Sequence, residues 1–260
     1  MGTLGPTIQV TSRPKKRIFV VDNLVRDLGF NQQALYCYTK LYSLDPENVD
    51  ALWDRASLAG EMRDLRTVRM PLGLDWWHSS ATGFVCQARH SLLAILKRFP
   101  HDITVLTELR PVLIELADFA LCASLYQDAL EYNQALNPLG HALDPSISGQ
   151  NEQSRFGFIE LLVLADLYNT MNEYERSIDT IRKGCRWLQG RATQKFWDVC
   201  EDDREYDVPG QEGTEPVHRA GDVKPGYYPL DINARHRVAV ARIKMGDTEE
   251  GKVSERSPEC

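Results

Sequence analysis

The residues that most constrain the fold are 29–64, because this stretch holds two apolar patterns of helical spacing separated by a proline turn. Ala34 and Tyr38 precede Pro46 by twelve and eight residues, and the second pattern starts after the proline. Apolar residues three and four apart give a helix one face to bury, and Asp-Pro ends the first helix because the proline ring fixes φ. The apolar positions are Ala34, Tyr38, Leu41, Leu44, Leu52, Trp53, Ala56, Leu58 and Ala59. The stretch therefore predicts two helices joined by a short turn.

This helix pair recurs along the chain. Ala88 and Leu92 stand at the same two offsets before Pro100. Further pairs are predicted at 103–130 and 161–184, and a last one begins at Asp231. Small residues let paired helices approach closely, and a period of about 34 residues with this pattern is typical of tetratricopeptide repeats. The predicted fold is therefore all-α, a tetratricopeptide-type helical-repeat superhelix (α-solenoid) with long irregular insertions.

The predicted organisation has five parts. They are a disordered basic tail at 1–17, a tetratricopeptide array at 18–189 interrupted by an irregular insertion at 68–87, an acidic loop at 190–229, the start of a further repeat at 230–252 and a disordered end at 253–260. The acidic loop is rich in Gly and Pro after Pro209, and its length without periodicity predicts that it is disordered or ordered only by a partner.

The insertion at 68–87 disturbs the repeat spacing. Pro46 and Pro100 are 54 residues apart, which is one period of about 34 residues plus 20. The first codons of the segment can match a splice donor and its last codon a splice acceptor, so we hypothesise that it is a translated intron. The segment 253–260 raises the same question. The alternative for 68–87 is a real functional loop with an aromatic tip.

Charge and hydropathy exclude several classes of function. The net charge of −7 argues against a chain that wraps nucleic acid by itself, because phosphate binding needs a basic surface. No run of about 18 apolar residues predicts a transmembrane helix, and no signal-peptide pattern is found, which predicts an intracellular protein. The basic stretch Arg13–Arg17 is either a nuclear import signal or a solvated tail.

No residue pattern predicts catalysis. The six histidines are dispersed, and the six cysteines form no CxxC pair, so we expect free thiols and no metal site. Nucleotide-binding loops, metalloprotease motifs and supported catalytic triads are not found. The acidic run lacks the alternate spacing and the glycine of a calcium loop. The sequence therefore predicts no enzyme activity, no cofactor and no metal.

Candidate partner-binding residues lie on the first helix of each pair, which lines the concave side of such arrays. They are Asp50, Trp53, Ser57, Glu61, Leu162, Asp166 and Asn169. Trp53 is the main candidate anchor, since aromatic residues dominate interface energetics; its alternative role is packing between repeats. The acidic run Glu201-Asp202-Asp203 is a second candidate, and its alternative is a solvated loop.

Several stretches resemble a known family. They include NQQALYCYTKLYSLDPENVDALWDRASL, LLAILKRFPHD, FIELLVLADLYNTMNEYERSID, WDVCEDDREYD and YYPLDINARHRVAVARIKMGD. Together they resemble the large tetratricopeptide subunit of TFIIIC in its fungal form, over most of 26–252 apart from 68–87. TFIIIC is the general factor that recognises the internal promoters of RNA polymerase III genes. The resemblance implies that the chain is an internal fragment, or a truncated gene model, of such a subunit.

The resemblance also implies a function. The family's large subunit is a nuclear scaffold that recruits TFIIIB, so the implied partners are other TFIIIC subunits and TFIIIB subunits. DNA would be reached only through the complex, and neither a membrane nor a small-molecule substrate is implied. The alternative is another tetratricopeptide assembly scaffold, from an RNA-processing or a cell-cycle complex.

Overall fold

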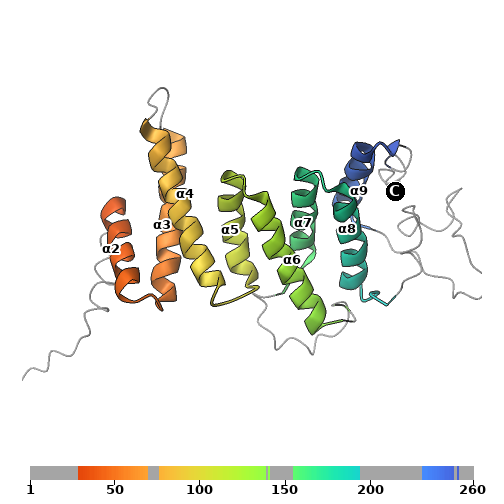
Figure 1. Ribbon diagram of the computed structural model, residues 1–260, viewed down its shortest axis with the longest axis horizontal. Helices are drawn as coiled ribbons and strands as arrows, with labels where there is room; N and C mark the ends of the chain where they lie inside the picture. Colours follow the sequence, from red (N-terminus) through yellow and green to blue (C-terminus); the bar gives the residue numbers. More distant parts are fainter. Residues whose placement is uncertain are drawn as a thin grey trace, which may run out of the picture. The chain divides into compact units, whose positions relative to one another are not determined.

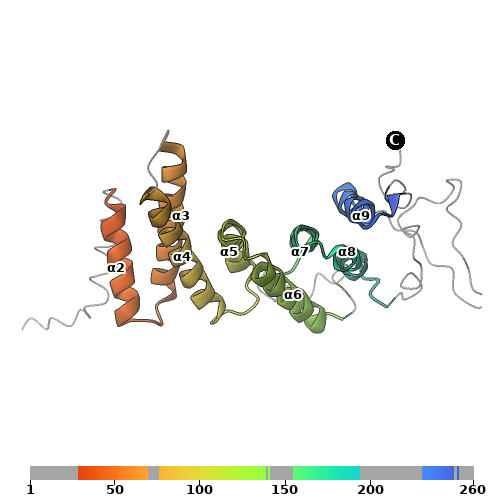
Figure 2. The ribbon, with the colours of Figure 1, turned by 45° about the horizontal axis from the view of Figure 1, so that its top comes forward.

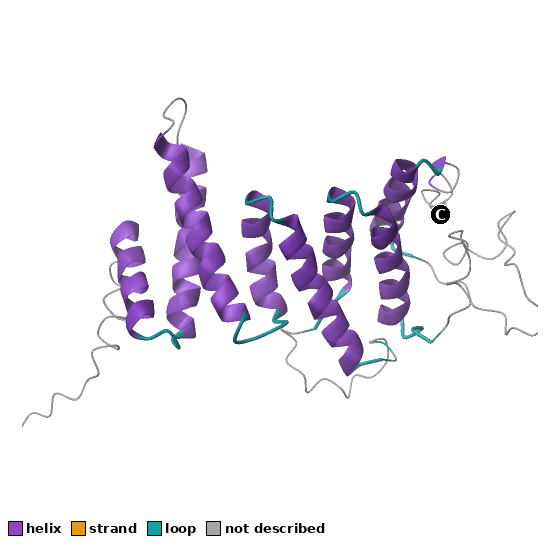
Figure 3. Cartoon of the chain, viewed as in Figure 1, coloured by secondary structure: helices purple, strands orange, loops and turns teal. Residues whose placement is uncertain are grey.

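The computed structural model describes residues 29–69, 76–138, 140, 155–193, 230–248 and 251. Regular secondary structure in this part of the chain is entirely helical (Figure 1, Figure 3). The helices are α2 (Asn31–Leu44), α3 (Val49–Arg69), α4 (Trp76–Leu96), α5 (Ile103–Glu115), α6 (Phe119–Leu136), α7 (Phe158–Thr170), α8 (Tyr174–Leu188) and α9 (Ile232–Met245). The all-α helical-repeat class predicted from the sequence is confirmed.

The chain divides into two compact units. The first comprises Met1–Pro100 with Thr107–Val112, and the second comprises His101–Leu106 with Leu113–Cys260. In the first unit α3 packs between α2 and α4, and these three helices stand side by side in chain order (Figure 1, Figure 2). In the second unit α7 packs against α6 and α8, and α9 packs against both α7 and α8.

The second helix of each pair buries a seam of three residues at constant spacing. In α8 the seam is Ser177, Ile181 and Gly184, all buried. A Cβ on Gly184 would lie 2.3 Å from Leu161 Cδ1, so only a residue without a side chain lets α8 approach α7 this closely. The equivalent buried residues are Ala34, Tyr38 and Leu41 in α2, Ala88, Leu92 and Ile95 in α4, and Cys122, Tyr126 and Ala129 in α6. The predicted repeat of small and large residues is thus present in all four helices.

The first helices of three pairs end in one common geometry. Ala117, Asn172 and Gly246 have φ of 54°, 63° and 93°, in the left-handed region. The residue after each donates its N–H to a carbonyl five residues back: Asp118 to Leu113, Glu173 to Tyr168 and Asp247 to Arg242, at 2.9, 2.9 and 3.0 Å. This is the six-to-one bond of the Schellman motif, which ends a helix and reverses the chain. These three turns lie within or next to the helix pairs predicted at 103–130, at 161–184 and after Asp231.

The irregular structure predicted for 68–87 is wrong over most of that stretch. Helix α3 continues to Arg69 and α4 begins at Trp76, while 70–75 lie outside the described residues. The physical reason is that Val85 is buried and stands three residues before Ala88, so the inserted segment extends the apolar stripe of α4 backwards. Each helix has 21 residues, whereas α5 and α7 have 13.

Other sequence expectations have mixed outcomes. Leu44 is 58% exposed, because it is rotated away from the stripe that Ala34, Tyr38 and Leu41 form on α2. Cys122 and Cys185 are buried, whereas Cys37 is half-buried and Cys86 is exposed, and none of these four forms a disulfide with a described residue. None of the helices in the described ranges is long and apolar enough to cross a membrane. The predicted tail at 1–17, residues 194–229 of the acidic loop and the end at 253–260 lie outside those ranges.

A candidate protein-docking pocket on helices α3, α4 and α5

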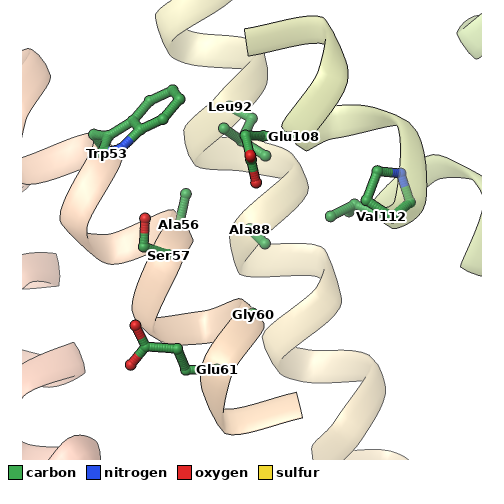
Figure 4. A pocket seen from close by; sticks show the side chains of 10 residues that line it. Trp53, Ala56, Ser57, Gly60, Glu61, Ala88, Leu92, Glu108 and Val112 are labelled. Atoms are coloured by element: carbon green, nitrogen blue, oxygen red, sulfur yellow. The ribbon is translucent and has the colours of Figure 1, made fainter. Parts of the chain in front are cut away.

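A pocket of about 440 Å³ lies within the first unit, between α3, α4 and the part of α5 that belongs to this unit (Figure 4). Helix α3 contributes Trp53, Ala56, Ser57, Gly60 and Glu61. Helix α4 contributes Ala88 and Leu92, and α5 contributes Glu108, Pro111 and Val112. Its volume is in the range of sites that hold a small ligand or a few side chains.

The floor of the pocket is apolar and closely packed. Ala56, Ala88, Leu92 and Val112 are 5%, 2%, 3% and 7% exposed. These residues belong to the core between helices, so their positions are fixed by packing rather than by a ligand. Gly60 adds open space, since a Cβ there would meet nothing within 4 Å. The pocket therefore has a rigid base and one wall without a side chain.

The rim of the pocket carries the polar and aromatic groups. Trp53, Ser57 and Glu61 are spaced four residues apart on one face of α3. Trp53 and Ser57 are half-buried, and Glu61 is exposed. Glu108 is exposed on α5 and makes no ion pair with any described residue. Among the described residues, no lysine, arginine or histidine lines the pocket, and the described rim combines an indole, a hydroxyl and two carboxylates.

Local capping and one arginine position these helices. Asn48 begins α3 by accepting a hydrogen bond from the Ala51 N–H at 3.0 Å. Arg98, just after α4, donates to the carbonyl of Pro46, and its guanidinium lies 3.3 Å from the Glu47 carboxylate. The turn before α3 is thereby tied to the end of α4, which holds the two helices that form most of the pocket.

Three of the predicted site residues come together here. Trp53, Ser57 and Glu61 line the pocket, whereas Asp50 lies on the same helix but does not line it. Glu108 and Pro111 are not among the residues that the sequence analysis proposed for the site. The available signal was their spacing of three residues on the first helix of the next pair. Pro111 lies inside a helix that continues to Glu115.

The predicted residues of the second unit form a different arrangement. Leu162 and Asn169 are half-buried on α7. Asp166 accepts two hydrogen bonds of 2.7 Å from Nε and Nη2 of Arg237 on α9. This bidentate pair links α7 to α9, so Asp166 serves helix packing rather than standing ready for a partner. Glu201, Asp202 and Asp203 lie outside the described residues, and their role stays a prediction.

Tyr168 on α7 is a titratable group whose surroundings shift its pKa. Its hydroxyl is 3.2 Å from Gln127 Oε1 and accepts a hydrogen bond from Arg176 Nη2 at 3.1 Å. Burial raises the pKa of Tyr168, and the charge of Arg176 lowers it by a smaller amount. The group joins α7 to α6 and α8, which is a structural role. Within the described ranges no three His, Cys, Asp or Glu side chains are grouped to hold a metal ion.

Comparison with known proteins found solved structures and curated proteins that are similar to this chain. No family model matches it. The solved structure of MamA protein covers 92% of the chain at 12% identity with a TM-score of 0.47. TTC0263, described as a thermophilic TPR protein of Thermus thermophilus, covers 92% at 12% identity with a TM-score of 0.34. Because both scores are below 0.5, the repeat class rests on the chain's own helix pairs.

Curated relatives are more informative. The chain is 24% identical over 241 residues to transcription factor tau subunit sfc4 of Schizosaccharomyces pombe, which covers 90% of the chain and 21% of the relative. It is 26% identical over 247 residues to the transcription factor tau 131 kDa subunit of Saccharomyces cerevisiae, covering 86% of the chain and 24% of the relative. The chain thus spans about a fifth to a quarter of the length of these relatives. Both are fungal TFIIIC (tau) subunits, which confirms the resemblance drawn from the sequence.

Proposed function

We propose that this chain is part of a nuclear, non-enzymatic scaffold subunit of TFIIIC type, which recruits TFIIIB for transcription by RNA polymerase III. The observation that carries the proposal is its similarity to two transcription factor tau subunits over 86–90% of its length. Its partners would be other TFIIIC subunits and TFIIIB subunits, and DNA would be contacted only through them. The net charge of −7 supports this division of roles.

The docking surface that we assign to this role is the pocket on α3, α4 and α5. Trp53 supplies a half-buried aromatic anchor at its rim, and aromatic residues dominate the energetics of interfaces. Glu61 and Glu108 make the rim acidic, which favours a partner segment with basic residues and speeds its association more than it strengthens final binding. The predicted acidic run at 201–203 would add to the same steering.

Co-purification tests the proposal. The tagged chain is expressed in nuclei of the source organism and the retained proteins are identified by mass spectrometry. We expect TFIIIC and TFIIIB subunits, and we expect the double substitution Trp53→Ala with Glu61→Gln to reduce the yield of one of them. Retention of splicing or ubiquitin-ligase subunits instead would overturn the assignment. Unchanged retention in the double variant would move the interface to another surface while leaving the scaffold function intact.

A further inference from the structure

We propose that the surface where α2 meets α4 binds a carboxylate side chain of a partner segment, and that Arg55 of α3 recognises it. The inference goes beyond the proposed function, because Arg55 does not line the pocket on α3, α4 and α5 and calls for a partner group of the opposite charge. It rests on one buried cation, on two aromatic rings near it and on the composition of the two helices.

Arg55 is a buried charge, and no described residue supplies its counter-charge. Only 7% of the residue is exposed. Its Nε is enclosed without a hydrogen-bond partner, and no described carboxylate forms an ion pair with it. A guanidinium keeps its proton at physiological pH, so deprotonation cannot relieve the cost of burying this charge. Because buried charges in proteins are paired, we expect Arg55 to bind an anion.

Two rings connect Arg55 to the protein surface. Helix α3, which carries Arg55, packs against both α2 and α4. Burial lowers the pKa of Arg55, and the nearby phenol of Tyr42 on α2 raises it by a smaller amount. Tyr42 in turn contacts His90 on α4 edge to face, with ring centroids 6.1 Å apart. Tyr42 is half-buried and His90 is exposed, so we place the entrance of the site at these two rings.

The rings and the two helices favour an acidic partner. Neither the Tyr42 hydroxyl nor the His90 ring makes a hydrogen bond with a described residue, and both groups can donate to a carboxylate. The sequences of α2 and α4 contain no Asp or Glu, although the whole chain has a net charge of −7. Lys40 and Arg89 lie on these helices. A local surface of this sign attracts acidic segments and speeds their association.

A carboxylate matches Arg55 better than a phosphate does. Both anions accept the paired N–H groups of a guanidinium. A carboxylate carries one negative charge, which balances the single charge of Arg55, whereas a phosphorylated side chain carries about −1.5 to −2. The excess charge would have to be desolvated beside Arg55 without a counter-charge, which disfavours the phosphate.

A peptide titration of the full chain tests the inference. The probes are three blocked heptapeptides of glycine and serine with one central glutamate, glutamine or phosphoserine. Binding is followed by nuclear magnetic resonance through the backbone amides of Tyr42 and His90. We expect the glutamate peptide to bind about five-fold or more tightly than the glutamine peptide, and more tightly than the phosphoserine peptide.

Two variants and a matched control identify the recognising group. Arg55→Met removes the guanidinium but keeps an unbranched stem, so it should abolish the preference for glutamate over glutamine. Tyr42→Phe removes one donor and should weaken glutamate binding about two-fold or more. Lys97→Met is the control, because it removes one positive charge from an exposed position just after α4 and should change binding by less than about two-fold.

Thermal melts provide a second readout and show whether each variant is folded. Arg55→Met should melt at or above the temperature of the unsubstituted chain, since it replaces a buried charge that no described residue balances with an apolar side chain of similar length.

Three results would overturn the inference. They are equal binding of the glutamate and glutamine peptides, tighter binding of the phosphoserine peptide, and a loss of binding in Lys97→Met as large as that in Arg55→Met. A marked fall in the melting temperature of Arg55→Met would also overturn it, because the charge of Arg55 would then already be balanced within the chain.

Discussion

Substitution by alanine should lower the free energy of unfolding at Gly184 and raise it at Gly60. In Gly184→Ala the new Cβ would lie 2.3, 2.9 and 3.1 Å from Cδ1, Cδ2 and Cγ of Leu161, which is 0% exposed. Overpacking of this kind costs about 1–3 kcal/mol. Alanine regains about 1 kcal/mol of helix propensity over glycine. The net effect is a destabilisation on the order of 1 kcal/mol.

Gly60→Ala provides the matched comparison. Gly60 also lies inside a helix, but an added Cβ meets nothing within 4 Å. Only the propensity gain remains, so this variant should be more stable by about 0.5–1 kcal/mol. Urea unfolding followed by far-ultraviolet circular dichroism measures both free energies of unfolding.

A double-mutant cycle identifies the cause. Leu161→Ala alone should cost about 2–5 kcal/mol through cavity formation. Combined with Gly184→Ala, the loss should be smaller than the sum by at least about 0.5 kcal/mol, because the new methyl group occupies part of the cavity. If Gly184→Ala is as stabilising as Gly60→Ala, or if the cycle shows no coupling, close packing of α7 on α8 is not what requires a small residue at this position.

Four further predictions concern an ion pair, a helix-ending turn, a tyrosine and the inserted segment. A double-mutant cycle on Asp166 and Arg237 should give a coupling of about 0.5–1 kcal/mol that decreases as salt is added, since the pair is partly exposed; a coupling independent of salt would contradict this. Ala117→Gly should raise the unfolding free energy by about 0.5 kcal/mol, because a left-handed φ of 54° strains alanine; a loss of stability would show that the turn is unstrained. The raised pKa of Tyr168 means that its protonated form stabilises the fold below pH about 10 and that this stability is lost as the pH rises further, so Tyr168→Phe should flatten alkaline unfolding curves; curves that remain equally steep would exclude the group. Sequencing of the mature transcript should show that 68–87 is absent, and a chain without it should melt at a higher temperature; a message that retains the segment would refute the intron hypothesis.

The sequence predicts the helix pairs well because packing and turn chemistry both leave local signals. Small residues at Ala34, Ala88 and Ser177 are each followed four residues later by a large residue, and the structure buries all of these positions. The turns at Asn172 and Gly246 combine residues that tolerate left-handed φ with a polar residue that follows them. Such signals lie within a few residues of one another, so a single sequence reveals them.

The pocket is less predictable because its parts come from three helices. Trp53, Ser57 and Glu61 were accessible to prediction, since they share one helix face. Glu108 joins them only through the packing of α5 against the earlier helices, and its local spacing from Pro111 does not indicate which helices it will meet. Asp166 is the converse case. Its spacing matched a binding face, but Nε and Nη2 of Arg237, 71 residues later in the chain, both donate to its carboxylate.

Photo-crosslinking at Asp50 in nuclear extract tests the central claim most directly, that the face of α3 beside the pocket docks a transcription-factor partner. Asp50 is exposed and lies one turn before Trp53 without lining the pocket, so a photoreactive residue there leaves the site open. Tyr36 on α2, 62% exposed, is the control position. We expect a crosslink from position 50, and none from position 36, to a TFIIIB or TFIIIC subunit. Crosslinks of equal yield from both positions, or a product from position 50 that contains no such subunit, would contradict the account.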